Sequence, residues 1–305
     1  MKYKYLRQVL ESGQFTSTDF NGGKFVQILE QQIRQFTKAR YAVAVSSGTM
    51  ALYAVILAMD MKKSRIAFPS LTFRATKNSI LATDNKPVPT DITLDNLTIR
   101  QDVKNADCII PVHLYGHVAH IKELKEHGIP IIEDCAQSLG STYDGKHTGT
   151  FGDAGCFSFY PSKIISAGEG GMVITNKRSI AEKCKLIRNH GNDSIWGLNL
   201  RMSEIHASIA VEHMENISQI LDTKKNNIKI LKEKFHFLGQ FEPRPKEVRN
   251  NILYTTWTNS RKSMLKKYPT ARVYYPYTLG AGKNADLASK HVISFPTNYL
   301  ESNCK

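Results

Sequence analysis

Residues 41–59, YAVAVSSGTMALYAVILAM, join an apolar run to a helix-favouring run through a short polar turn. The first five residues predict a buried strand, and residues 50–59 predict a helix. Residues 46–49, SSGT, therefore lie where a strand ends and a helix begins. Several backbone N–H groups without intrahelical partners meet at such a junction.

The same alternation continues outward from this stretch. Short apolar runs bounded by turn residues predict further strands at residues 65–69, 87–89, 109–113, 129–133, 154–159 and 172–175. Apolar residues at helical spacing occur at residues 25–36, 75–82 and 119–127. This order predicts an α/β fold with a mostly parallel sheet, helices on both faces and a ligand site at the carboxyl ends of the strands.

The chain changes character after residue 205. Residues 205–235 form one long helical pattern rich in lysine and asparagine, and residues 272–275 and 291–295 have strand-like composition. We therefore expect a large domain at residues 1–205. Residues 206–305 are expected to hold the long helix and a smaller α+β domain.

The composition is that of an ordinary globular protein, with 41% hydrophobic and 22% charged residues in 305. The formal net charge is +14, but the lysines and arginines are scattered, so we expect a solvated basic surface and no nucleic-acid binding. We find no apolar run long enough for a membrane span and no secretory leader, which predicts no membrane contact and a cytoplasmic location.

The cysteines are dispersed and form neither a CxxC pair nor a cysteine-histidine cluster at metal-binding spacing, so we expect reduced thiols and no metal site. They are Cys108, Cys135, Cys156, Cys184 and Cys304.

The segment IPIIEDCAQ, residues 129–137, is an apolar strand that ends in two acidic residues. Asp134 follows the strand at the edge where this class of sheet forms its sites. Two interpretations of its carboxylate are open. It caps the turn after the strand, or it pairs with the pyridinium nitrogen of a cofactor.

The segment GCFSFYPSK, residues 155–163, runs from an apolar strand into a turn that carries Ser158 and Lys163. A glycine-rich segment, SAGEGG, and another strand follow. Most lysines are solvated surface groups. Burial in a tight turn would instead destabilise the Lys163 ammonium, and Schiff-base chemistry requires the neutral amine.

The turn at Ser47, Gly48 and Thr49 also has two interpretations. Backbone amides at a helix start, together with a threonine hydroxyl, suit a phosphate group. The same residues are also common in ordinary helix caps.

Six segments in this order resemble one family: SSGTMAL, PSLTFRAT, PVHLYG, IIEDCAQSLGSTYDGKHTGTFGD, FSFYPSK and GEGGMVIT. They are similar to the motifs of the DegT/DnrJ/EryC1/StrS family of pyridoxal-phosphate-dependent sugar aminotransferases, which have transferase fold type I. The resemblance runs from Gly13 to Glu215, with fainter echoes in VYYP and SFPTNYL.

The resemblance implies roles around the cofactor ring. Lys163 matches the lysine that forms a Schiff base with pyridoxal phosphate, and Asp134 matches the partner of the ring nitrogen. Gln137 matches the glutamine near the phenolic oxygen. Phe73, in PSLTFRAT, takes the position of the aromatic side chain that stacks on the ring, although a phenylalanine there also suits the core.

The resemblance also implies a phosphate site. It includes Gly48, Thr49 and Ser158, the last two through their hydroxyls, and the backbone amide of Met50. Asn199, in GLNLRM, matches the asparagine that reaches the cofactor phosphate of the neighbouring subunit, which implies a homodimer with shared sites.

The implied activity transfers an amino group from glutamate to a nucleotide-linked keto sugar, a 4-keto-6-deoxyhexose, in amino-sugar and polysaccharide synthesis. The cofactor alternates between its pyridoxal and pyridoxamine phosphate forms. A branch of the family that dehydrates sugars carries histidine in place of the lysine, and Lys163 argues against that branch. We interpret His113 and His190 as structural.

The sequence departs from the family pattern in two places. The segment HGNDSIWGLN, residues 190–199, is shorter than in most relatives, and no histidine follows the tyrosine and proline of VYYPYTLG. The alternative function is therefore a catalytically weak protein that binds the cofactor or a nucleotide sugar in a regulatory or partner role.

Overall fold

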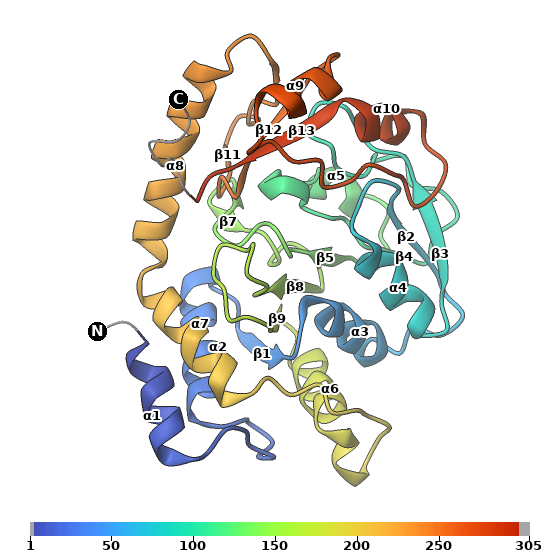
Figure 1. The fold of residues 1–305 in the computed structure, drawn as a ribbon. Coiled ribbons are helices and arrows are strands. Elements are labelled where there is room, and N and C mark those ends of the chain that lie inside the picture. The colour runs from blue at the N-terminus through green and yellow to red at the C-terminus, as the bar shows by residue number, and fades with distance from the viewer. Residues whose placement is uncertain (1–2, 299–305) are drawn as a thin grey trace.

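Residues 3–298 are described by the computed structural model, in which helices surround a central sheet (Figure 1). The strands of this sheet are β1 (Tyr41–Val45), β2 (Arg65–Pro69), β3 (Lys86–Thr90), β4 (Cys108–Ile109), β5 (Ile132–Asp134), β8 (Ala154–Ser158) and β9 (Gly171–Thr175). Hydrogen-bonded neighbours give two groups, β3-β2-β4 and β5-β8-β9-β1. Parallel bridges from Ile109 to Ile131 and from Val112 to Asp134 join the two groups into one sheet.

The predicted mostly parallel sheet is confirmed. Strands β2, β3 and β4 are parallel to one another, as are β5 and β8. Strand β9 runs antiparallel to both of its neighbours, β8 and β1, so β1 shares the direction of the parallel strands. The proline-rich strand β3 lies at the end of the order, where a missing N–H removes no ladder bond.

Helices cover both faces of the sheet, as the sequence predicts. Alternate residues of β1 point to opposite sides. Ala42 and Ala44 belong to a core shared with α2 (Lys24–Thr37) and α7 (Glu204–Glu215). Val43 and Val45 belong to another core, shared with α3 (Gly48–Ala58) and α6 (Arg178–Arg188).

The remaining elements before residue 216 are short. They are α1 (Lys4–Ser12), α4 (Arg74–Ala82), α5 (Ile121–Lys125), 3-10 turns at Leu114–Gly116 and His190–Asp193, and strands β6 (Thr142–Tyr143) and β7 (Lys146–His147). Strand β11 (Glu247–Val248) returns from the C-terminal part to pair with β6.

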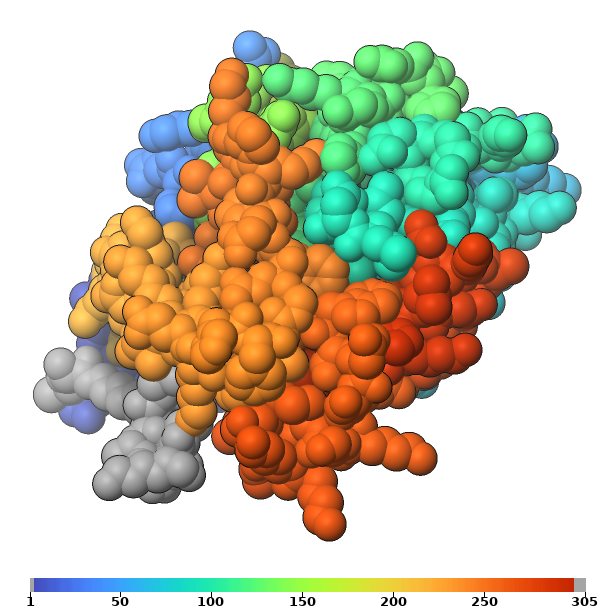
Figure 2. All heavy atoms as spheres, turned by 90° about the horizontal axis from the view of Figure 1, so that it is seen from above, coloured from blue at the N-terminus to red at the C-terminus, as the bar shows by residue number. Residues whose placement is uncertain are grey.

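The C-terminal part packs around a second, antiparallel sheet. Its elements are α8 (Ile217–Lys234), β10 (Gly239–Gln240), β12 (Leu253–Trp257), α9 (Arg261–Lys267), α10 (Lys283–His291) and β13 (Val292–Pro296). The rings of Phe235 and Phe295 stack with centroids 4.2 Å apart in its core. In Figure 2 this part, orange to red, lies side by side with the teal segments of the N-terminal part.

The prediction of one helix over residues 205–235 is wrong, because the helix is broken at Asn216. The Asn216 side chain donates to the carbonyl of Glu212 and ends α7. The two halves also serve different cores. Ala210 of α7 packs against the central sheet, whereas Leu231 of α8 packs in the C-terminal core.

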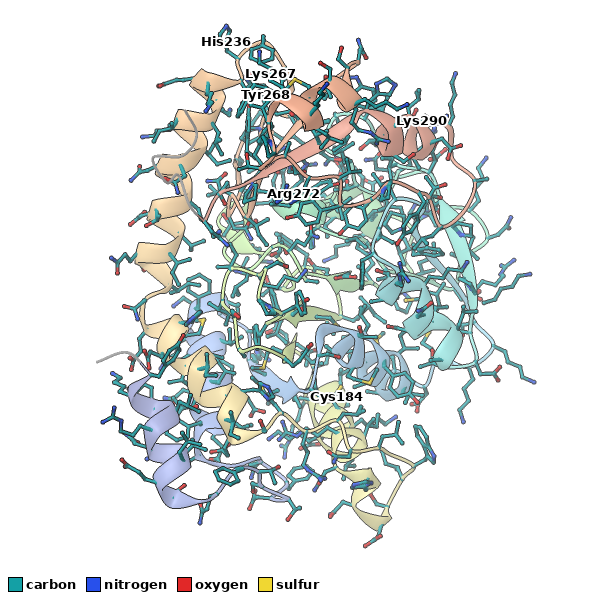
Figure 3. All side chains as sticks on the ribbon, in the orientation of Figure 1. Cys184, His236, Lys267, Tyr268, Arg272 and Lys290 are labelled. Atoms are coloured by element: carbon teal, nitrogen blue, oxygen red, sulfur yellow. The ribbon has the colours of Figure 1, made fainter. Side chains whose placement is uncertain are left out.

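Two other predicted elements are shorter than expected. The strand at residues 272–275 is reduced to one bridge between Arg272 and Ser294, beside β13 (Figure 3). Tyr275 leaves the sheet to bury its side chain elsewhere, and the following proline has no N–H to continue a ladder. The helix at residues 119–127 is limited to α5, since side chains of Asn96 and Arg244 take the carbonyl of Val118.

The thiols of the described part match expectation. Cys108, Cys135, Cys156 and Cys184 are free and buried, and Cys304 lies outside the described residues.

Within residues 3–298 no helix is both long and apolar enough to cross a bilayer. The domain division at residue 205 stays a prediction.

A buried ion pair ties α2, β1 and α6 together. The Arg188 guanidinium lies 2.7 Å from a Glu30 carboxylate oxygen and donates to the Ala44 carbonyl at 2.9 Å. The same Glu30 oxygen accepts the Ala44 N–H. Arg188→Ala would leave the Glu30 charge buried without a partner, so we expect a loss of about 3–5 kcal/mol of unfolding free energy, measured by urea denaturation.

Arg178→Ala is the matched control. Its partner Glu182 lies one turn along the same helix, and both side chains are exposed. Such pairs contribute about 0.3–0.5 kcal/mol. Equal destabilisation by the two substitutions would contradict the role given to Arg188.

Candidate active site

Three strand ends meet in a row at one edge of the central sheet. Gly171, the first residue of β9, pairs with Val45 at the end of β1 and with Ser158 at the end of β8. A Cβ atom on Gly171 would lie 2.4 Å from the carbonyl carbon of Ser47. Glycine is therefore required at 171 for the turn after β1 to reach this edge.

The predicted phosphate residues form this corner. A Cβ atom on Gly48 would lie 2.8 Å from the Ser158 Cβ, so the absence of a side chain lets the start of α3 contact Ser158. The first N–H groups of α3, at Gly48 and Thr49, have no intrahelical acceptors and suit an anion.

The capping interpretation of this turn is confirmed, and the phosphate interpretation stays a prediction. Ser47 is the N-cap of α3, and its hydroxyl accepts the Met50 N–H at 3.2 Å. The predicted bond from the Met50 amide to a phosphate therefore competes with this cap.

Asp134 ends β5 at the same edge and is buried. One carboxylate oxygen accepts the Ala136 N–H at 3.1 Å, and the other accepts the Thr76 hydroxyl at 2.9 Å. Burial raises the pKa of the carboxyl, while these hydrogen bonds and the charges of Lys163 and His113 oppose the rise. The cap of the turn therefore uses only the oxygen bonded to Ala136, and the other oxygen is bonded to Thr76.

Lys163 lies in the turn after β8, where its N–H donates to the Tyr160 carbonyl at 2.9 Å. Burial lowers the pKa of its ammonium, and the Asp134 charge partly offsets this effect. Burial disfavours the charged form of both groups, so it shifts their pKa values in opposite directions. This is the environment that the sequence predicts for a lysine nucleophile.

Gln137 connects the site to the C-terminal part of the chain. Its side chain accepts the Tyr115 N–H at 2.6 Å and donates to the Tyr275 hydroxyl at 2.7 Å. Tyr275 is buried, and its ring meets that of Tyr115 edge to face at 5.6 Å. Burial, together with the charge of Asp134, raises the Tyr275 pKa.

Thr76 and Tyr275 are not among the site residues that the sequence predicts. Both lie within segments quoted for the resemblance, PSLTFRAT and VYYP. A hydroxyl one helical turn after Phe73 was the available signal for Thr76. No sequence feature indicates that Tyr275 folds back to Gln137.

Phe73 is not a core residue, because 54% of it is exposed. It is the N-cap residue of α4, and its carbonyl accepts the Thr76 N–H at 3.2 Å. The ring thus begins the helix that supplies the hydroxyl bonded to Asp134. Its stacking role stays a prediction.

Asn199 is exposed, and its side chain accepts the Arg201 N–H at 3.3 Å. The adjacent Leu200 carbonyl accepts the Ser46 N–H, which places this segment next to the turn before α3. The contact of Asn199 with a second subunit stays a prediction. Nearby, 61% of Trp196 is exposed.

His113, Glu133 and Cys135 could offer metal ligands within 4.8 Å of one another. However, the Glu133 oxygens accept the N–H groups of Gly149, Phe151 and Gly152, and His113 lies 2.8 Å away. The Glu133 carboxylate therefore holds the loop before β8 through backbone hydrogen bonds. This agrees with the structural interpretation of His113.

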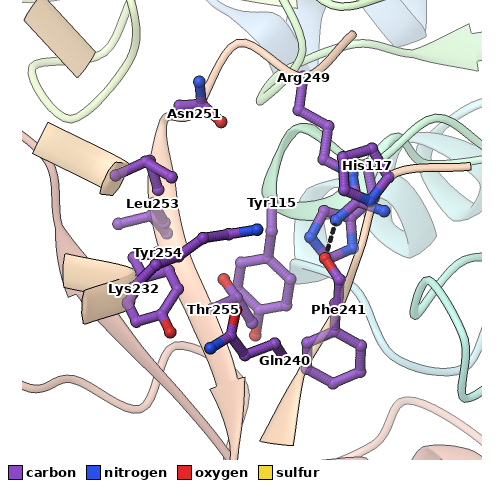
Figure 4. Close-up of a pocket in the computed structure, with 12 residues that line it drawn as sticks. Tyr115, His117, Lys232, Gln240, Phe241, Arg249, Asn251, Leu253, Tyr254 and Thr255 are labelled. Atoms are coloured by element: carbon purple, nitrogen blue, oxygen red, sulfur yellow. Dashed lines mark hydrogen bonds between the residues drawn. The ribbon is translucent and has the colours of Figure 1, made fainter. Parts of the chain in front are cut away.

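A separate cavity of about 140 Å³ lies between α8, β12 and the loop after β10 (Figure 4). Its two cations are neutralised, since Lys232 pairs with Glu242 and Arg249 pairs with Glu247. It contains none of the predicted site residues and is not the candidate site.

The residues at the sheet edge fit pyridoxal phosphate by the chemistry of their donors and acceptors. Asp134 offers a buried carboxylate for a ring nitrogen, and Lys163 offers an amine with a lowered pKa. The start of α3 and Ser158 offer N–H and O–H donors for a phosphate.

Thr76→Val tests the support of Asp134. Loss of a hydroxyl bond to the carboxylate should raise the Asp134 pKa further and weaken binding of pyridoxal phosphate about 10-fold to 100-fold, measured by cofactor titration. Thr83→Val is the control, because Thr83 is the C-cap residue of the same helix and its hydroxyl donates to the Ser79 carbonyl. An unchanged dissociation constant for Thr76→Val would contradict the role of this bond.

A family model for the DegT/DnrJ/EryC1/StrS aminotransferases matches residues 1–280. GDP-perosamine synthase of Vibrio cholerae is 33% identical over 73% of the chain and 65% of its own length. The GDP-perosamine synthase of Escherichia coli O157:H7 is 31% identical over 83% of the chain and 72% of its own length. The pleiotropic regulatory protein of Geobacillus stearothermophilus is 30% identical over 96% of the chain and 88% of its own length.

Solved structures share the fold. S. venezuelae DesV has a TM-score of 0.89 at 24% identity, covering 96% of this chain and 87% of its own. A DegT DnrJ EryC1 StrS aminotransferase from Brucella abortus has a TM-score of 0.90 at 21% identity, covering 98% and 91%. The predicted transferase fold type I is confirmed, and the chain belongs to the DegT/DnrJ/EryC1/StrS aminotransferase family.

Proposed function

We propose that the protein is a pyridoxal-phosphate-dependent aminotransferase that acts on a nucleotide-linked keto sugar. The observation that carries the proposal is the common location of a buried carboxylate, Asp134 at the end of β5, and an amine, Lys163 in the turn after the neighbouring strand β8. They lie at the sheet edge that also presents the start of α3, and burial lowers the Lys163 pKa. Family membership and relatives named as GDP-perosamine synthases support it.

Pyridoxal phosphate, when bound, supplies an aldehyde that exchanges with amines and a ring that delocalises an electron pair from the amine-bearing carbon. Asp134 would accept the hydrogen bond of the protonated ring nitrogen and keep the proton there. Gly48, Thr49 and Ser158 would hold the phosphate. Phe73 would cover the ring, and Gln137 would orient it.

Lys163 would act twice. Its amine would first hold the cofactor. Its Nζ, when free, would then act as the base that takes the proton from the donor's α-carbon. A lowered pKa favours the neutral amine that both roles need.

The finer parts of the proposal concern its partners. We assign glutamate as amino donor and a 4-keto-6-deoxyhexose on a nucleoside diphosphate as acceptor, for polysaccharide synthesis in the cytoplasm. We also assign a homodimer in which Asn199 reaches the neighbouring site. The exposed side chains Ile195, Trp196 and Leu198 beside Asn199 offer an apolar surface for that contact.

A regulatory protein is the second candidate, because one relative bears that name. Such a protein would hold pyridoxal phosphate on the same lysine, so Lys163 does not separate the two candidates. The relatives named as GDP-perosamine synthases favour the aminotransferase.

Lys163→Ala tests the proposal. Wild-type protein mixed with pyridoxal phosphate should be yellow, and borohydride should fix the cofactor to the peptide that contains Lys163, as detected by mass spectrometry. The variant should lose both the visible band and the labelled peptide. Lys62→Ala, at an exposed lysine, should keep both.

Addition of glutamate to the yellow protein should then bleach the visible band, and a nucleotide-linked keto sugar should restore it. Colourless wild-type protein would exclude the cofactor. A stable band that no amino donor or keto sugar changes would instead favour the regulatory candidate.

A further inference from the structure

Lys224 of α8 is a buried lysine with neutral partners. It is 4% exposed, and its ammonium donates to the Thr297 hydroxyl at 3.3 Å and to the side-chain oxygen of Asn298. Within residues 3–298 it forms no ion pair. Lys232, two turns further along the same helix, instead pairs with Glu242 at 2.7 Å.

An ammonium without an anion is costly to bury. Burial accordingly lowers the pKa of Lys224 to about 8. Neutral oxygens replace only part of the water that the charge loses. An anion bound at this position would offset the desolvation cost of the Lys224 ammonium. The side chain therefore has the properties of an anion receptor.

Lys224 also lies in the right place for a substrate. It lines a cavity of about 380 Å³ together with Lys163. The other polar residues of the lining are Ser166, His213, Gln219, Thr223, Thr297 and Asn298, and none of the lining residues is acidic. Among residues 3–298, lysine and histidine thus supply the titratable groups of this lining, which favours an anionic ligand.

A purely structural role does not explain the lysine. Thr297, at the end of β13, is already held by its hydroxyl bond to the Asn251 carbonyl at 2.6 Å and by the Asn227 side chain at 2.9 Å. The link between α8 and β13 therefore does not require a charge at position 224.

We propose that Lys224 forms an anion-binding subsite of the cavity at Lys163 and recognises a phosphate or carboxylate group of the substrate. The inference rests on the proposed function. The anion would come from the diphosphate of the nucleotide sugar or from a carboxylate of the amino donor. Both are oxyanions that a lysine binds as a point charge.

Lys224→Gln tests the subsite, and Lys225→Gln is the matched control, because this neighbouring lysine is exposed and is not part of the cavity lining. GDP and glutarate serve as unreactive probes of the two anion sources, titrated by calorimetry into the cofactor-loaded protein. Loss of a charged contact should weaken one probe about 10-fold to 100-fold in Lys224→Gln. The control should bind both probes as the wild type does.

The two arms identify the source. Weaker GDP binding with unchanged glutarate assigns the diphosphate, and the reverse assigns the donor carboxylate. Lys224→Arg should retain most of the affinity, which guards against a loss that comes from misfolding, and thermal melting of each variant checks the fold. Unchanged binding of both probes in a folded Lys224→Gln variant would overturn the proposal.

These titrations do not depend on turnover. Wild-type protein that binds GDP through Lys224 and yet transfers no amino group would refute the proposed function alone. Wild-type protein that transfers the group, with a Lys224→Gln variant of equal probe affinity and equal KM values, would refute the subsite alone.

Discussion

Burial of the Asp134 carboxylate and partial burial of Lys163 at one edge of the central sheet are the constraint on which the site depends. Asp134 loses water at the end of β5, and Lys163 loses water in the turn after β8, so the pKa of the carboxyl rises and that of the ammonium falls. Neighbouring groups stabilise each charged form. Thr76 and the Ala136 amide support the carboxylate, and the carboxylate in turn attracts the lysine.

The backbone makes this edge available to a phosphate. Since β1 runs in the direction of β5 and β8, its following turn reaches the same edge. Glycines at 48 and 171 allow backbone and Ser158 to approach closely there. The fold thus places a helix start, a carboxylate and an amine together without any of them being adjacent in sequence.

Much of this could be predicted from the sequence. Short apolar runs between turns gave the strands and their mostly parallel order, and the quoted motifs identified Asp134, Lys163 and the turn at Gly48. The strands follow from local spacing. The roles given to Asp134, Lys163 and Gly48 rest instead on the order of motifs spread over residues 13–215, and they stay predictions.

Long-range contacts could not be predicted in this way. The break at Asn216 arises because α7 and α8 join different cores, and the bond from Gln137 to Tyr275 connects residues far apart in the chain. Burial of Lys224 is of the same kind. In the sequence it is one of two adjacent lysines in a basic helix. Packing of α8 against the end of β13 buries Lys224 and leaves Lys225 exposed.

Transfer of an isotope tests the central claim most directly. Protein incubated with ¹⁵N-labelled glutamate and a nucleotide-linked 4-keto-6-deoxyhexose should yield an amino sugar that carries ¹⁵N, detected by mass spectrometry, and Lys163→Ala should yield none. Label in the sugar with the variant, or no label with cofactor-loaded wild type across a panel of nucleotide-linked keto sugars, would contradict it.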